Sequence, residues 1–328
     1  MIAGSMALRS VITGVVLCTA LLSAPARADQ PPAIHRIGVL MPPLATSPEE
    51  GLRQGLRELG YVEGKSILIE WRRSAATGEQ LQLLATDLAK SKVDLIVAVG
   101  APAARAALAA TTLPVVLAPV GDAVGSGFAA SLARPGGNST GVSVESTELI
   151  AKRLELLRVL APRVARIVFL MNSSNPIGAR TLESAQQAAR MLHVQLVTLD
   201  ARNAGELDAA LRALPRSEAG GVLVSADFLF LANKAKIASA MRKARLPAIV
   251  ALKEYHDDGV LMSYGVDLKE AMHRAAVYVD KILNGAKPSE IPIEQVSKFE
   301  LIIDLRVARE MGIAVPQELL FRADEVIR

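Results

Sequence analysis

The chain contains the same order of expected elements twice, and the second copy begins roughly 130 positions after the first. Each copy alternates short apolar runs with amphipathic stretches and ends on Leu-Pro followed by aliphatic residues. The runs are 37–41, 67–69, 94–99 and 113–117 in the first copy, and 167–171, 195–199, 221–224 and 246–250 in the second. Such a repeat predicts two similar lobes that face each other across a ligand-sized cleft.

The composition of the apolar runs predicts the kind of sheet that each lobe contains. The runs are continuous and rich in Val, Ile and Leu, which is typical of parallel strands covered on both faces. Amphipathic stretches such as Ser47–Leu59, Glu79–Lys90 and Thr181–Leu192 separate them. This alternation predicts an α/β fold with a doubly wound parallel sheet in each lobe.

Three expected crossings between the lobes divide the chain. Gly-rich segments precede the first two crossings, and the third lies in a strand expected over Ile291–Ile303, between a helix over Leu268–Asn284 and a last helix over Leu305–Met311 capped by Asp304. The expected first lobe comprises residues 29–141 and 261–297, and the second lobe comprises 142–260 and 298–328. A three-segment hinge of this kind suits opening and closing.

The N-terminal residues 1–28 have the pattern of a secretory signal peptide. Arg9 is followed by the apolar run Val11–Leu22, and Ala26-Arg27-Ala28 predicts cleavage after Ala28. The apolar run has about 12 residues, too few for the roughly 20 that span a bilayer. We therefore expect a periplasmic protein with no stable membrane insertion after the signal is removed.

The remaining residues have nearly balanced charge. Removal of residues 1–28 takes away two arginines, which leaves 35 basic against 33 acidic residues. No one-sided field remains to attract nucleic acid. The only cysteine, Cys18, lies in the predicted signal peptide. The mature chain must therefore be held together by an apolar core rather than by disulfides.

Signatures of enzymes and metal sites are weak in this sequence. Gly64-Lys65-Ser66 resembles the end of a phosphate-binding loop, but the glycine required five positions earlier is Leu59. The histidines show no metal-ligand spacing, and His256-Asp257-Asp258 is more typical of a solvated loop than of a metal site. There is no Gly-x-Ser-x-Gly motif. We therefore expect no catalytic residues, no metal and no cofactor.

Ligands of open α/β sheets bind at the carboxyl ends of the strands. The loops expected there are 41–47, 100–103, 119–124, 172–176, 225–229 and 251–256. Gly100–Ala103 begins a helix whose free backbone N–H groups suit a carboxylate or phosphate, and Asn175-Pro176 could repeat this arrangement. Either segment could equally be a plain helix start.

Polar and aromatic side chains in these loops are candidates for ligand contact. Asp227 and Asp122 could each bind a ligand ammonium, a contact worth about 1.5–3 kcal/mol, or could each cap a helix. Aromatic residues are scarce, 11 in all, and those at a cleft could stack on a ligand, although Phe228 could instead belong to the core. The expected ligand-binding residues are Pro42, Leu44, Ala101, Pro102, Ala103, Gly121, Asp122, Asn172, Ser174, Asn175, Asp227, Phe228, Tyr255, Ser263 and Tyr264.

Several longer motifs resemble those of one known family. They are Leu132–Asn138, Leu261–Gly265, Lys298–Ile303 and the final segment Arg322–Ile327. They are similar in order and spacing to motifs of the substrate-binding proteins of ABC importers with the type I periplasmic-binding fold. This group includes binders of tryptophan and other aromatic amino acids.

The resemblance implies a two-lobed receptor that closes on a small solute and delivers it to a membrane permease. An amino acid or a related carboxylate is the implied solute. However, Ala101-Pro102 lacks the hydroxyl that many amino-acid receptors use for a carboxylate. A sensory receptor that presents its ligand to a membrane kinase or chemoreceptor remains an alternative. A transcriptional regulator would need a helix-turn-helix where the signal peptide stands, and an enzyme would need catalytic residues in the cleft.

Overall fold

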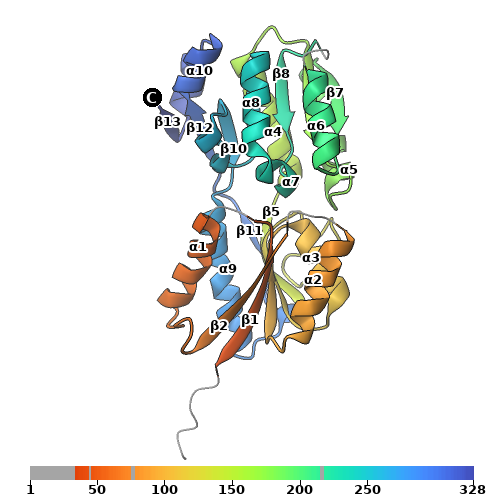
Figure 1. Ribbon diagram of the computed structural model, residues 1–328, viewed down its shortest axis with the longest axis vertical. Helices are drawn as coiled ribbons and strands as arrows, with labels where there is room; N and C mark the ends of the chain where they lie inside the picture. Colours follow the sequence, from red (N-terminus) through yellow and green to blue (C-terminus); the bar gives the residue numbers. More distant parts are fainter. Residues whose placement is uncertain (1–33, 44–45, 75–77, 215–217) are drawn as a thin grey trace, which may run out of the picture. The chain divides into compact units, whose positions relative to one another are not determined.

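The computed structural model describes residues 34–43, 46–74, 78–214 and 218–328, and Ile34–Arg328 form one compact unit. The predicted signal peptide and its cleavage site lie outside the described residues. Two sheets, each packed between helices, make up the two lobes (Figure 1). The α/β fold predicted from the sequence, with two doubly wound sheets, is confirmed.

The first lobe contains a sheet of six parallel strands in the order β11-β5-β4-β3-β1-β2. Its strands are β1 (His35–Met41), β2 (Ile67–Arg73), β3 (Leu95–Ala98), β4 (Val115–Gly121), β5 (Ser139–Val144) and β11 (Glu294–Val296). Its helices are α1 (Thr46–Glu58), α2 (Glu79–Lys90), α3 (Ala101–Ala110), α9 (Leu268–Leu283) and the short 3₁₀ turn η3 (Pro288–Glu290).

The second lobe contains a seven-stranded sheet in the order β13-β12-β10-β9-β8-β6-β7, in which only the β10–β12 pair is antiparallel. Its strands are β6 (Arg166–Met171), β7 (Gln195–Asp200), β8 (Gly221–Val224), β9 (Ala248–Val250), β10 (Met262–Gly265), β12 (Glu300–Asp304) and β13 (Glu325–Ile327). Its helices are α4 (Ser146–Leu160), α5 (Gly178–Met191), α6 (Ala204–Ala213), α7 (Phe228–Ala232), α8 (Lys234–Ala244), α10 (Leu305–Met311), α11 (Gln317–Arg322) and the 3₁₀ helix η2 (Lys253–Asp258).

The internal repeat of the sequence corresponds to a repeat in strand order. The first lobe contains β4-β3-β1-β2 and the second contains β9-β8-β6-β7, with the strands of each set in the same chain order. Thus β1 is equivalent to β6, β3 to β8 and β4 to β9. The loops that follow equivalent strands therefore occupy equivalent places in the two lobes.

Both faces of each sheet are buried, as continuous apolar strands require. In β1, Ile37, Val39 and Met41 pack with α1 and α9, whereas Leu40 faces α2 and α3 on the other side. The second sheet likewise has an apolar cluster on each face. Because both faces of each sheet are covered, a ligand can reach the sheets only at the strand ends.

Two of the expected lobe boundaries differ from the structure. Residues 142–144 extend β5 in the first sheet, and Met262–Gly265 form β10 in the second. The expected strand over Ile291–Ile303 is two strands, because β11 pairs with β5 and β12 with β10. The chain therefore crosses between the sheets at about 145, 266–267 and 297–299. Of the described helices, none is long and apolar enough to cross a membrane.

Candidate ligand-binding site

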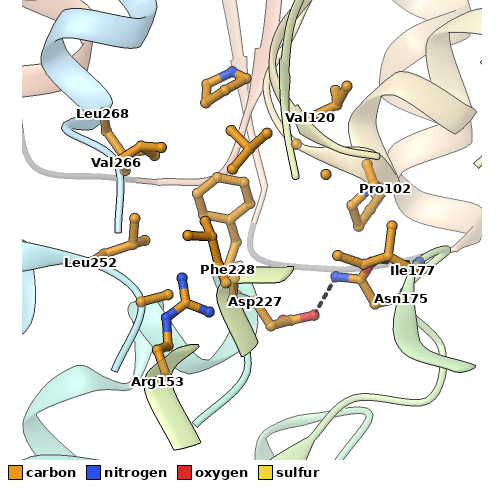
Figure 2. A pocket seen from close by; sticks show the side chains of 18 residues that line it. Pro102, Val120, Arg153, Asn175, Ile177, Asp227, Phe228, Leu252, Val266 and Leu268 are labelled. Carbon is orange, nitrogen blue, oxygen red and sulfur yellow. Dashed lines mark hydrogen bonds between the residues drawn. The ribbon is translucent and has the colours of Figure 1, made fainter. Parts of the chain in front are cut away.

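A cavity lies between the two lobes, at the carboxyl ends of strands from both sheets (Figure 2). It encloses about 80 Å³, less than the roughly 300–1,000 Å³ of typical small-molecule sites. A solute of amino-acid size must therefore displace side chains or part the lobes. The lining residues are Gly100, Ala101, Pro102, Pro119, Val120, Gly121 and Val144 from the first lobe, Leu149, Arg153, Asn175, Ile177, Ala226, Asp227, Phe228, Ala251 and Leu252 from the second, and Val266 and Leu268 at and just after the second crossing.

Phe228 is the side chain that fills the centre of this cavity. It begins α7, directly after the loop that follows β8, and it packs against apolar clusters of both lobes. Its partner in the first lobe is Gly100, which follows the equivalent strand β3. A Cβ atom on Gly100 would lie 2.3 Å from Phe228 Cε2, and the φ angle of Gly100 is +83°. Only glycine satisfies both conditions without strain.

Asp227 lines the cavity and also caps α7, so its two expected roles are compatible. Its Oδ1 accepts a hydrogen bond from the Leu229 backbone N–H at 2.7 Å. Its Oδ2 accepts from the side-chain amides of Asn175 at 2.7 Å and Asn172 at 3.1 Å. Burial raises the pKa of Asp227 above its ordinary value, although these three hydrogen bonds oppose the shift. The carboxylate is thus held in place by neutral donors, with no cation beside it among the contacts of the described residues.

The two expected helix-start sites differ. The helix α3 begins at Ala101, and Ala101 and Pro102 line the cavity, so this helix N-terminus opens onto it. The helix α5 begins at Gly178, three residues after Asn175, because Asn175 instead turns the chain and bonds Asp227. The expected anion site at Asn175-Pro176 is therefore absent, and Asn175 serves to orient Asp227.

Arg153 lines the same cavity and was not expected from the loop pattern. It belongs to α4, has 3% of its surface exposed, and donates a hydrogen bond from Nε to the Tyr264 carbonyl at 2.7 Å. Its sequence signal is an arginine on an apolar helix face, since Ile150, Leu154 and Leu157 at helical spacing are all buried. Arg153 lies in the middle of a helix, so its position relative to the strand ends did not predict that it lines the cavity.

Asp122 joins the lobes outside the cavity. Its Oδ1 accepts from the Gly125 N–H at 2.9 Å, and its Oδ2 lies 2.8 Å from Nη2 of Arg180 on α5 in the second lobe. The Asp122 side chain is nearly buried while Arg180 is half exposed. Such a pair is worth about 1 kcal/mol or less in water. Asp122 therefore contributes to lobe contact rather than to the cavity lining.

The expected ligand-binding residues fall into three groups. Ala101, Pro102, Gly121, Asn175, Asp227 and Phe228 line the cavity, whereas Pro42, Ala103, Asp122, Asn172, Ser174, Tyr255, Ser263 and Tyr264 do not, and Leu44 lies outside the described residues. Asn172 and Ser174 support the site indirectly, because Asn172 bonds both Asp227 and Ser174.

Three expected contacts lie in the second lobe, away from the cavity. Tyr255 is buried in the apolar core. Ser263 is buried with its hydroxyl 2.8 Å from His256 Nε2. The Tyr264 ring packs against Phe299 with 6.0 Å between ring centroids. Ser263 and Tyr264 lie in β10 and Tyr255 in η2, and the sequence does not show toward which side of these elements each side chain points.

No metal-ion site is found among the residues described. No group of three or more His, Cys, Asp or Glu side chains in the described ranges is arranged around a common point. In the His256-Asp257-Asp258 segment, both aspartates pair with Lys234 instead.

Comparison with known proteins places this two-lobed arrangement in one family. The family model described as "ABC transporter substrate binding protein" matches residues 41–327. The chain belongs to this family. The match covers nearly the whole of both lobes, including every residue that lines the cavity.

Two similar proteins are named for an amino acid or have been solved with one. A tyrosine-binding protein of Clostridioides difficile (strain R20291) is 26% identical over 257 residues, which are 78% of this chain and 74% of that protein. The crystal structure of an ABC domain from Streptococcus pneumonia in complex with L-Trp is 25% identical and has a TM-score of 0.83, covering 90% of this chain and 100% of that one. The ligand-free, open structure of a substrate-binding protein from Clostridium difficile has a TM-score of 0.63 at 22% identity. The match covers 90% of this chain and 99% of that one.

The contact between Gly100 and Phe228 generates a stability prediction for this family member. Gly100→Ala should lower the free energy of unfolding by more than Gly127→Ala. Both glycines have positive φ, +83° and +75°, so both substitutions strain the backbone, and Gly100, whose ψ is 162°, lies in a region that essentially only glycine adopts, which adds to its cost. Only the Cβ at position 100 also meets the Phe228 ring, whereas nothing lies within 4 Å at position 127. Urea unfolding of the three proteins measures the difference.

A second substitution tests whether Phe228 causes that difference. In the Phe228→Ala background, Gly100→Ala should cost less than it does in the wild type, whereas the cost of Gly127→Ala should not change, because only the clash at position 100 has been removed. An unchanged excess cost would show that the ring does not set the requirement for glycine.

Proposed function

We propose that this protein is the solute-binding component of an ABC importer and that it captures an amino acid or a related small carboxylate between its lobes. The observation that carries the proposal is the apolar cavity at the strand ends of both sheets, with Phe228 of one lobe packed on Gly100 of the other. A solute in this cavity contacts both lobes and therefore favours their closure.

The ligand class rests on the cavity lining and on the named relatives. Phe228 and the surrounding aliphatic side chains offer an apolar surface to a ligand side chain, and Asp227 offers a carboxylate to an ammonium group. One relative is a tyrosine-binding protein, and another is in complex with L-Trp. An amino acid with an aromatic or large aliphatic side chain fits both observations.

Membership of the family supports a proposal for location and partner. The predicted signal peptide over residues 1–28 supports export, and the substrate-binding proteins of ABC transporters deliver their solutes to a membrane permease. We therefore propose a periplasmic location and a permease partner that recognises the ligand-bound form.

A thermal-shift screen of residues 29–328 tests the ligand class. The panel contains amino acids, small carboxylates, purines and sugars. A ligand at about 100 times its dissociation constant adds roughly 2.7 kcal/mol to the free energy of unfolding, which raises Tm by several degrees. We expect the largest rise with aromatic or branched amino acids. A rise with purines or sugars alone, or none at all, would contradict the proposed ligand class.

Two phenylalanine variants show whether the screen reports on the cavity. Phe228→Ala should abolish most of the ligand-induced rise in Tm, since the apolar platform is lost. Phe321→Ala is the matched control because the Phe321 side chain is 82% exposed on α11. It should bind as the wild type does.

Replacement of Asp227 tests the ammonium contact. Asp227→Asn keeps an oxygen that can cap α7 but removes the charge. It should weaken L-tryptophan binding by about tenfold or more, because a charge-assisted hydrogen bond is lost. Binding of indole-3-propionate, which lacks the amino group, should be unaffected. Isothermal titration calorimetry of the two ligands with the two proteins measures the effect.

The same contact predicts a pH dependence. Burial raises the pKa of Asp227, so its carboxyl group takes up a proton at a higher pH than an exposed aspartate does. Affinity for L-tryptophan should therefore fall as the pH is lowered through that raised pKa, and the Asp227→Asn variant should lack this step. If the affinity of the wild type depends on pH in the same way as that of the variant, Asp227 does not contact the ammonium group.

A further inference from the structure

Arg153 is a buried cation at the cavity wall. Its side chain projects from α4 with 3% exposure, and Leu149, one helical turn earlier, lines the same cavity. Figure 2 shows Arg153 and Asp227 below the Phe228 ring, with Asp227 directed away from Arg153 and toward Asn175. The two charged groups thus belong to one cavity without pairing to each other.

The charge of Arg153 is not neutralised by the described part of the chain. Of its five N–H donors, the Nε–H bonds the Tyr264 carbonyl, and no carboxylate of the described residues forms an ion pair with the guanidinium. Burial lowers the pKa of Arg153 to about 10, and only the Tyr264 hydroxyl opposes that shift. Other arginines of the chain, such as Arg73 and Arg306, sit beside a carboxylate.

An unpaired charge in an apolar environment is unfavourable until a counter-charge arrives. The guanidinium presents planar, paired donors that match a carboxylate, and the low local dielectric strengthens such a contact. Among the described residues of the first lobe that line the cavity none is charged: the N-terminus of α3 opens there, but Ala101 and Pro102 carry no hydroxyl and Pro102 has no backbone N–H. The cavity therefore obtains its anion partner from the second lobe.

We propose that Arg153 binds the carboxylate of the captured solute, so that the cavity recognises a zwitterion whose carboxylate faces Arg153 and whose ammonium faces Asp227. This assignment rests on the proposed function and specifies its ligand chemistry. The apolar part of the solute then lies against Phe228.

Matched carboxylate and amide probes test the assignment. Indole-3-propionate and indole-3-propionamide have the same shape but differ in charge, and L-tryptophan and L-tryptophanamide form a second pair. The wild type should prefer each carboxylate over its amide by about tenfold or more, as a charge-assisted contact requires. Arg153→Met should lose this preference and bind both members of a pair equally. Titration calorimetry on each protein gives the ratios.

The control and the conservative variant separate binding from structure. Arg158→Met removes an arginine of the same helix that bonds only the Ala161 carbonyl and does not line the cavity, and it should keep the wild-type preference. Arg153→Lys retains a positive charge but lacks the planar guanidinium. Its preference for each carboxylate over its amide should therefore be smaller than that of the wild type but still measurable. This variant also covers the case in which Arg153→Met does not fold.

Distinct outcomes separate this assignment from the amino-acid function. If Arg153 only fastens α4 to the Tyr264 carbonyl, its replacement by Met or Lys will weaken carboxylate and amide equally, and the assignment is wrong. If indole-3-propionate binds with an Arg153-dependent preference while L-tryptophan does not bind, the carboxylate contact stands and the amino-acid function fails. If neither carboxylate binds the wild type, both are overturned.

Discussion

The packing of Phe228 on Gly100 is the contact on which the candidate site depends. Gly100 follows β3 and Phe228 follows β8, which are equivalent strands of the internal repeat. Equivalent loops of the two lobes therefore contact each other. Parallel strands make this possible, because all of their carboxyl ends lie at one edge of a sheet. A side chain larger than hydrogen at position 100 would separate the lobes at this point.

The chemistry of the cavity comes from two charged groups that the apolar wall isolates. Asp227 is oriented by Asn172, Asn175 and the Leu229 N–H, none of which carries charge. Arg153 is oriented by a single carbonyl. Neither charge is neutralised within the described chain, and this arrangement is unfavourable for an empty site but favourable for a solute with two opposite charges. The proposed site thus combines an apolar centre with two charged groups, Asp227 and Arg153, for recognition of the solute.

Much of the fold was predictable from the sequence, because burial on both faces of a parallel sheet leaves a continuous apolar pattern. Asp304 as the cap of α10 was predicted to the residue, since capping depends on a local hydrogen-bond pattern. The expected lobe boundaries after residues 141 and 260 and the single strand expected over 291–303 were wrong, because strand pairing near a hinge is decided by tertiary contacts.

Position after a strand predicted part of the cavity lining, whereas ligand contact by these residues stays a prediction. Asp227 and Phe228 line the cavity as expected from their position after β8. Tyr255 and Ser263 carry suitable side chains but lie in the core, because strand-end position does not determine which way a side chain points. Arg153 donates to the backbone carbonyl of Tyr264, 111 positions away, and its place at the cavity is evident only from the structure.

Simultaneous contact of the solute with both lobes is tested most directly by a distance measurement between the lobes. Residues 29–328 contain no cysteine, so Leu83→Cys on α2 and Met191→Cys on α5 can carry a pair of spin labels at exposed positions. Double electron–electron resonance is then recorded without ligand and with a saturating amino acid from the thermal-shift screen. If the solute contacts both lobes, the distribution of distances between the two labels should become narrower and centre on one value when the solute is bound. Binding with an unchanged distribution would contradict this contact.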